Sequence, residues 1–257
     1  MMDFNERVIP GVSANFLYRE ALARYEFALQ LITSHKKVLD LACGTGYGSA
    51  LLSKTNTVVA VDRDREAIAF AREHFGKDVQ FTIGDVEKGN KKWGTFDAIC
   101  AFEIIEHLEK PEIFLKNAFQ LLKPNGIMIL STPNAEIPVP QNSTKSKYHT
   151  KEFTRGEFEQ ILKKVFNNVE LFGQRKDAIA KKAFEEFMKS QSARQALVNH
   201  DRFNARQYIP KEMKELGWKY AGSLFGRKAQ DSLKTKNFPI TKRVSESTEY
   251  FVAVCRK

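Results

Sequence analysis

The chain has 257 residues, 42% of them hydrophobic, which is enough for one large domain or for one domain with a sizeable insertion. Its formal net charge is +10, and no apolar run approaches the roughly 18 residues that a membrane-spanning helix needs. The first seven residues lack the basic-then-apolar layout of a signal peptide, and the three cysteines form no CxxC pair. We therefore expect a cytoplasmic protein without disulfides or a thiolate metal site.

Short apolar, β-rich runs alternate with amphipathic segments through the first half of the chain. Residues 13–32 are predicted to form an amphipathic helix that lies across the carboxyl edge of a sheet and closes a ligand pocket there. The following strands are predicted over residues 37–41, 57–61, 79–83, 96–101 and 126–131, and the helices between them over residues 48–54, 65–75 and 111–122. This alternation is typical of a doubly wound α/β sheet with helices on both faces.

The second half is predicted to complete a Rossmann-like, mostly parallel sheet of seven strands. Thr154-x-x-Glu157 is a capping box that begins a helix over residues 154–165, and residues 169–172 and 250–255 are the sixth and seventh strands. About seventy residues lie between these two strands, far more than a connection needs. We divide the chain into an N-terminal helix, a core and a mainly helical insertion, with the boundaries 1–35, 36–175 with 246–257, and 176–245.

The positive charge is concentrated in the insertion. Residues 175–243 contain 17 lysines and arginines against 7 aspartates and glutamates, which accounts for the whole net charge. A basic surface of this kind favours an anionic partner, such as nucleic acid, a nucleotide-linked sugar or a membrane face. An ordinary solvated, lysine-rich helical face explains the same charges.

The first predicted strand leads into a glycine-rich turn with the sequence VLDLACGTGYGS over residues 38–49. Gly44 and Gly46 allow backbone to approach a ligand at the start of the next helix. A dinucleotide-binding turn would have a third glycine where Ser49 stands, and it would rarely have an acid at the position of Asp40. An acid here suits a cationic ligand better than a pyrophosphate, so we disfavour a nicotinamide dehydrogenase.

Two further acids follow the next two predicted strands. Asp62 comes 18 residues after Gly44, where a carboxylate can accept both hydroxyls of a ribose, and Asp85 is positioned to accept from an adenine amino group. Any one of these aspartates could simply be a helix N-cap. Three acids beside a glycine turn indicate a nucleoside site.

Together the segments VLDLACGTGYGS, VVAVDRD, IGDVE and FDAICAFEIIEHL resemble the motifs of class I S-adenosylmethionine (SAM)-dependent methyltransferases, over about residues 36–135. The resemblance implies an antiparallel seventh strand beside the sixth. It also implies that Gly44 and Gly46 lie under the methionine part of SAM, that Asp62 holds the ribose, that Asp85 and Val86 flank the adenine, and that Phe102 lines the cofactor. Arg24-Tyr25 could contact the SAM carboxylate, but we favour an ordinary helix-face pairing for it. The predicted cofactor-binding residues are Tyr25, Asp40, Ala42, Gly44, Gly46, Asp62, Arg63, Asp85, Val86 and Phe102.

Four potential metal ligands follow the fourth strand. If the segment after Phe102 is helical, Glu103, Glu106 and His107 have the spacing to converge on one small volume. His149 would come from the loop after the fifth strand, which returns to the same edge of the sheet. Carboxylates with imidazoles suit Mg²⁺, Mn²⁺, Fe²⁺ or Zn²⁺, whereas a solvated helix start is the ordinary explanation of E-x-x-E-H.

This set, followed by the EFT helix start, resembles the metal site of small-RNA 2′-O-methyltransferases. It is also similar to ubiquinone-pathway and glycan-cluster O-methyltransferases. We assign metal binding to Glu103, Glu106, His107 and His149, and catalysis to Glu106, His107 and His149. Without a metal, His107 or His149 could act as a general base.

The leading hypothesis is a SAM-dependent O-methyltransferase, assisted by a divalent metal, that acts on a sugar, a glycan or another vicinal-diol small molecule. The insertion would then cover an anionic acceptor. An RNA 2′-O-methyltransferase is the first alternative, with the insertion following phosphates. A SAM-binding protein without catalytic activity is the second, since a fold does not determine function.

Overall fold

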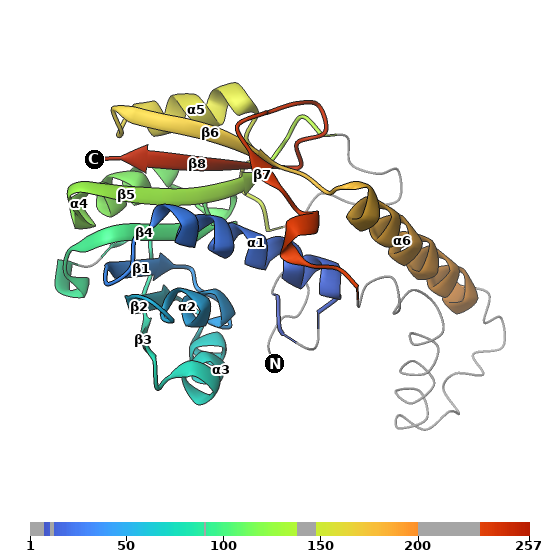
Figure 1. The fold of residues 1–257 in the computed structure, drawn as a ribbon, viewed down its shortest axis with the longest axis horizontal. Helices are drawn as coiled ribbons and strands as arrows, with labels where there is room; N and C mark the ends of the chain where they lie inside the picture. Colours follow the sequence, from blue (N-terminus) through green and yellow to red (C-terminus); the bar gives the residue numbers. More distant parts are fainter. Residues whose placement is uncertain (1–7, 11–12, 90, 138–147, 200–231) are drawn as a thin grey trace.

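The computed structural model describes residues 8–10, 13–89, 91–137, 148–199 and 232–257, and they form a sheet of eight strands between two layers of helices (Figure 1). The strand order is β3-β2-β1-β4-β5-β8-β6-β7. The strands are β1 Lys37–Leu41, β2 Thr57–Asp62, β3 Val79–Ile83, β4 Phe96–Phe102, β5 Leu122–Pro133, β6 Asn168–Gln174, β7 Ile240–Thr241 and β8 Tyr250–Arg256.

The helices alternate with these strands along the chain, as the periodicity predicts. Thr154 caps α5 through the predicted box, because its hydroxyl accepts from the amide of Glu157 while the Glu157 carboxylate accepts from the amide of Thr154. The α-helices are α1 Asn15–Leu31, α2 Tyr47–Leu52, α3 Arg65–Phe75, α4 Pro111–Leu121, α5 Arg155–Lys163 and α6 Ala178–Asn199. Short 3₁₀ turns are η1 Lys91–Trp93, η2 Ile105–His107 and η4 Thr235–Asn237.

Helices cover both faces of the sheet. Successive side chains of a strand point to opposite faces, so the neighbours Val38 and Leu39 of β1 belong to two different cores. Val38 lies in the core with Leu52 and other side chains of α1, α2 and α3. Leu39 lies in the core with Phe114 and other side chains of α4 and α5. This doubly wound arrangement is the predicted fold class.

The end of the chain enters the sheet in the predicted direction. β8 lies between β5 and β6 and is antiparallel to both, while β1 to β5 are parallel. All seven predicted strands are present, and the two-residue β7, which pairs with β6 at the sheet edge, adds an eighth. The fifth strand also begins before the predicted residue 126. Leu122 already pairs with Phe96. Asn125, with a φ of 60°, lies in an irregular part of the strand, between this first pair and the regular pairing that starts at Ile127.

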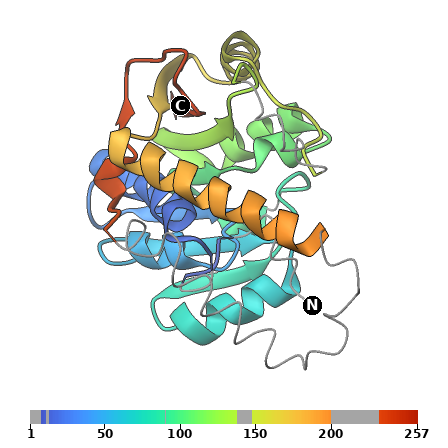
Figure 2. The same ribbon diagram turned by 90° about the vertical axis from the view of Figure 1, so that its right-hand side faces the viewer.

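The first part of the proposed insertion is the long helix α6, which extends away from the sheet (Figures 1 and 2). Near its start, Phe184 and Phe187 pack edge-on against Phe16 of α1, at centroid distances of 5.4 and 5.1 Å. Residues 200–231 lie outside the described part of the chain, so the boundaries and helical character of the insertion stay a prediction. Within the described residues, no helix is both long and apolar enough to cross a membrane.

Candidate active site

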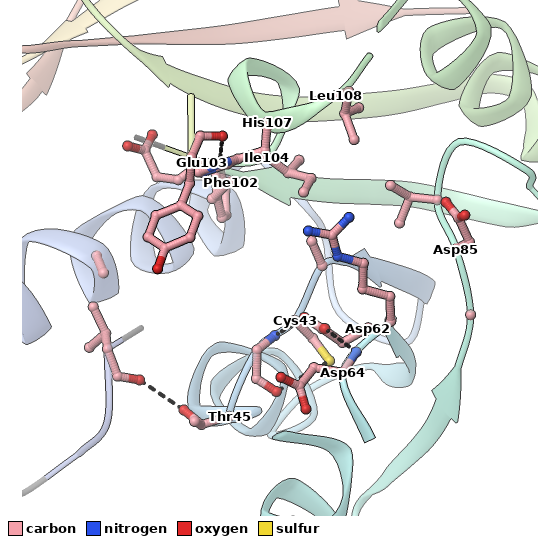
Figure 3. A pocket seen from close by; sticks show the side chains of 18 of the residues that line it. Cys43, Thr45, Asp62, Asp64, Asp85, Phe102, Glu103, Ile104, His107 and Leu108 are labelled. Carbon is pink, nitrogen blue, oxygen red and sulfur yellow. Dashed lines mark hydrogen bonds between the residues drawn. The ribbon is translucent and has the colours of Figure 1, made fainter. Parts of the chain in front are cut away.

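A cavity of about 370 Å³ opens at the carboxyl ends of the parallel strands (Figure 3). Its walls come from the turn after β1, the ends of β2 and β4, the loop after β3, and one side of α1. The predicted cofactor residues in these walls are Tyr25, Ala42, Gly44, Asp62, Arg63, Asp85, Val86 and Phe102. Side chains far apart in sequence therefore meet where ligands of open α/β sheets bind.

Asp62 organises the glycine turn. Its Oδ2 accepts a 2.8 Å hydrogen bond from the amide of Gly44, and its Oδ1 accepts one of 2.9 Å from the amide of Asp64. A carboxylate oxygen has two lone pairs, so both oxygens can still accept from ligand hydroxyls. Across the cavity, Asp85 accepts from the amide of Glu87 at 3.0 Å and lines the wall beside Val86.

The two glycines of the turn have different roles. Gly44 has a φ of 54°, and a Cβ added there would meet nothing within 4 Å, so its open side faces the cavity. Gly46 has a φ of 81°, and its Cβ would lie 2.8 Å from Ala71 and from the ring of Phe81. Gly46 was predicted to bind the cofactor, and it is not among the residues that line the cavity. Only a glycine fits against Ala71 and Phe81, so in the described structure Gly46 allows the turn to pack closely on α3 and β3.

Asp40 lies behind the cavity wall instead of in it. It is fully buried within β1, accepts a 2.6 Å hydrogen bond from Ser49 Oγ, and has the hydroxyl of Tyr25 3.3 Å from both of its oxygens. Burial raises the pKa of this carboxyl to about 7. Asp40, which was predicted to bind the cofactor, is therefore not among the residues that line the cavity. Asp40 instead holds Tyr25, whose ring lines the cavity and meets Phe102 edge-on at 4.8 Å.

Arg24 lines the same cavity, contrary to the helix-face pairing that we favoured for it. The side chain is 5% exposed, donates from Nη1 to Oε1 of Gln174 at 2.7 Å, and lies over the ring of Tyr250 at 4.8 Å. Its buried Nε has no hydrogen-bond partner in the described structure. The spacing of residues within the helix could not reveal this position of the Arg24 side chain, because its partner Gln174 is 150 residues away in sequence. A buried cation that lines the cavity suits a ligand carboxylate.

Glu106, His107 and His149 form a compact group of potential ligands. One ligand atom from each lies within 4.8 Å of the others. Glu106 is fully buried, and its Oε2 accepts from Thr132 Oγ1 at 3.1 Å. Its Oε1, which has no hydrogen-bond partner in the described structure, lies 3.8 Å from Nε2 of His107. Burial, with the nearby carboxylate of Glu103, raises the pKa of Glu106 well above its usual range.

Backbone hydrogen bonds bring His149 to this group. The amides of Thr150 and Lys151 donate to the carbonyl of Glu106 at 2.8 and 3.1 Å. In return, Nδ1 of His107 lies 3.0 Å from the carbonyl oxygen of Tyr148. A carbonyl can only accept, so this Nδ1 carries the proton and Nε2 is left as the basic nitrogen.

Glu103 stays outside the group. Its convergence with Glu106 and His107 depended on a helical turn from Glu103 onward, but the 3₁₀ turn η2 begins at Ile105, and Glu103 has a φ of 54°. Its carboxylate accepts a 2.5 Å hydrogen bond from Ser131 Oγ and lines the cofactor cavity near Arg24. Three of the four predicted metal ligands are therefore brought together, and the fourth faces the cavity.

These residues fit a divalent metal by the chemistry of their atoms. One carboxylate and two imidazoles are donors that Mn²⁺, Fe²⁺ or Zn²⁺ accept, and an unpartnered buried carboxylate oxygen is costly without a cation or a proton. His107 belongs both to this group and to the cavity wall, so the two sites adjoin.

The fold and the site define a class I SAM-dependent methyltransferase domain. Residues 32–191, more than half of the chain, match the family described as "Methyltransferase domain", and the chain belongs to that family. This membership rules against the dehydrogenase alternative.

Known proteins agree with this class. A probable S-adenosylmethionine-dependent methyltransferase of Mycolicibacterium smegmatis is 29% identical over 163 residues, covering 61% of this chain and 62% of the relative. The mitochondrial ubiquinone biosynthesis O-methyltransferase of Schizosaccharomyces pombe is 37% identical over 106 residues, 38% of each chain. This chain thus spans less than two thirds of these curated relatives. A possible histamine N-methyltransferase from Thermotoga maritima is 15% identical, covers 94% of this chain and 91% of its own, and shares the fold with a TM-score of 0.59.

Proposed function

We propose that this chain is an O-methyltransferase that methylates a hydroxyl of a sugar, a glycan or another vicinal-diol small molecule with the help of a divalent metal. The observation that carries the proposal is the meeting of Glu106, His107 and His149 beside the cofactor cavity, with a buried Glu106 oxygen left unpartnered. The name of the S. pombe relative, an O-methyltransferase, supports an oxygen acceptor.

In this proposal the cavity holds SAM by its charged ends and its nucleoside. Asp62 would accept from the ribose hydroxyls, while Asp85 and Val86 flank the adenine. Arg24, which lines the cavity, would bind the methionine carboxylate, and Tyr25 and Phe102 would form the apolar wall. With the cofactor fixed in this way, most of the rate enhancement would come from positioning the acceptor oxygen in line with the methyl group.

Glu106, His107 and His149 would hold the metal. A bound divalent ion supplies a Lewis acid that lowers the pKa of an acceptor hydroxyl and so makes it a better nucleophile. The chain contributes a fully buried carboxylate and an imidazole whose tautomer is set by the Tyr148 carbonyl. A diol would offer two adjacent oxygen atoms to an ion held by these three residues, which is why we favour a diol.

Three alternatives differ from this proposal. In the absence of a metal, Nε2 of His107 would take the proton of the acceptor hydroxyl, since an imidazole titrates near neutral pH. An RNA acceptor is favoured by the excess of ten positive charges over residues 175–243, and it predicts binding that weakens steeply with salt. A protein that binds SAM without methylating anything is the remaining alternative.

Calorimetry of SAM binding, with Mn²⁺ present and absent, tests the proposal. We expect SAM to bind in both conditions, Mn²⁺ to bind wild type, and the Glu106→Ala/His149→Ala variant to lose Mn²⁺ while it keeps SAM. SAM binding with no affinity for Mn²⁺ would leave the His107 base as the mechanism. Methyl transfer from radiolabelled SAM to vicinal-diol sugars and to short RNAs then distinguishes the acceptors.

A further inference from the structure

Glu152 is a carboxylate that the motifs did not single out, and it contacts one of the two site histidines. Its Oε1 lies 3.2 Å from Nδ1 of His149, and both side chains are only 17% exposed. An i,i+3 pair of this kind at the surface contributes little to stability. Here the pair is mostly buried and adjoins Glu106 and His107. What matters is therefore how Glu152 orients the His149 ring and where it places the imidazole proton, and not how much the pair stabilises the fold.

The backbone fixes Glu152 from both sides. Before it, the amides of Thr150 and Lys151 are bonded to the carbonyl of Glu106. After it, Phe153 is buried in the core, its carbonyl accepts from Ala135 at 3.0 Å, and Thr154 caps α5. The carboxylate therefore reaches His149 from a fixed position and does not depend on a freely moving chain.

The two imidazoles are oriented in the same way. Nδ1 of His107 faces the Tyr148 carbonyl, Nδ1 of His149 faces the Glu152 carboxylate, and the rings meet edge-on at 4.8 Å. We propose that Glu152 is a positioning residue that accepts the Nδ1–H of His149 and so keeps the Nε2 lone pair available to the site. A carboxylate behind a histidine ligand commonly changes metal affinity by about 10–100-fold.

The tautomer can be read directly, without activity and without metal. Long-range ¹H–¹⁵N spectra of the ¹⁵N-labelled protein, recorded at about pH 8.5, where imidazoles are neutral, distinguish Nδ1–H from Nε2–H. The His149→Gln variant identifies the His149 signals among the five histidines. We expect Nδ1–H in wild type, and a shift toward Nε2–H in Glu152→Ala.

Two further variants separate positioning from a general loss of charge. Glu152→Gln keeps an oxygen that can accept, so we expect it to preserve the wild-type tautomer, and this result stands even if the alanine variant does not fold. Glu109→Gln removes an exposed carboxylate two residues from His107 and should change nothing. An Nε2–H tautomer of His149 in wild type, or a folded Glu152→Ala variant with unchanged signals, would overturn the inference.

The consequence for metal binding rests on the proposed function and is tested separately. By Mn²⁺ calorimetry we expect Glu152→Ala to bind about 10–100-fold more weakly than wild type. A Glu152→Ala affinity equal to that of wild type would overturn the role of Glu152 toward the metal. Failure of wild type to bind Mn²⁺ would instead overturn the metal-assisted proposal, while the tautomer result still decides whether Glu152 positions His149.

Discussion

The hydroxyl of Ser49 donates a 2.6 Å hydrogen bond to the carboxylate of Asp40. Ser49 stands where a dinucleotide-binding turn has its third glycine. A glycine at this position could not make this hydrogen bond. The same carboxylate is within reach of the hydroxyl of Tyr25, which lines the cofactor cavity. A fully buried acid thus connects α1, β1 and α2 beneath the glycine turn.

Asp40 makes stability depend on pH in a defined direction. Burial raises its folded-state pKa to about 7, so the folded chain retains a proton that the unfolded chain releases near pH 3.9. Its stabilising contribution is complete below about pH 4 and is lost as the pH rises through about 7. Relative to Asp40→Asn, we expect wild type to lose about 2–3 kcal/mol of unfolding free energy between pH 5 and pH 8.

Urea unfolding of both proteins at the two pH values checks this. The raised pKa values of Glu103 and Glu106 act in the same direction, but they are shared by both proteins and largely cancel in the comparison. Parallel pH profiles for the two proteins would contradict an elevated pKa at Asp40.

The two glycines of the turn should fail in different ways when a methyl group is added. Gly44→Ala places the methyl in open space at the cavity, so we expect SAM affinity to fall at least about tenfold, with about 1 kcal/mol lost from backbone strain. Gly46→Ala forces a clash with Ala71 and Phe81 and should cost about 1–3 kcal/mol more in stability. Thermal melts and SAM calorimetry measure both, and equal losses of stability would contradict the assignment.

Arg24→Met tests the carboxylate anchor. A charge-assisted hydrogen bond contributes about 1.5–3 kcal/mol, so affinity for S-adenosylhomocysteine should fall about 10–100-fold. 5′-Methylthioadenosine lacks the amino-acid carboxylate and should bind wild type and variant alike. A parallel loss for both ligands would show that the variant damages the cavity as a whole.

Glu103 and Glu106 belong to the same motif, but we expect only Glu106 to be needed for metal binding. Glu106 is buried and Glu103 is half-buried. Glu106→Gln is expected to abolish Mn²⁺ binding. Without metal, we expect this variant to lose at most about 1 kcal/mol of unfolding free energy relative to wild type, because the substitution removes an unpartnered buried carboxylate. Glu103→Gln should keep Mn²⁺ binding, since Ser131 holds that carboxylate away from the group. Calorimetry of both variants decides, and loss of Mn²⁺ by Glu103→Gln would mean that its side chain turns toward the metal.

Local sequence patterns were enough for most of the fold. Apolar alternation located the strands of the sheet, and residue spacing located the turn at Gly44, the acids Asp62 and Asp85, and the cap at Thr154. These features depend on neighbouring residues: strand periodicity, backbone freedom at glycine, and side-chain hydrogen bonds within a few positions. These features can therefore be predicted from the sequence alone.

Tertiary structure decided which of the motif residues face the site. Asp40 and Gly46 do not line the cavity, Arg24 does, and Glu103 lies outside the group that Glu106 forms with His107 and His149. Each outcome depends on a contact between distant segments, such as Arg24 with Gln174 or the Glu106 carbonyl with the loop before α5. The direction in which a side chain points is set by packing and hydrogen bonds across the sheet edge, and sequence spacing along one strand or turn does not contain that information.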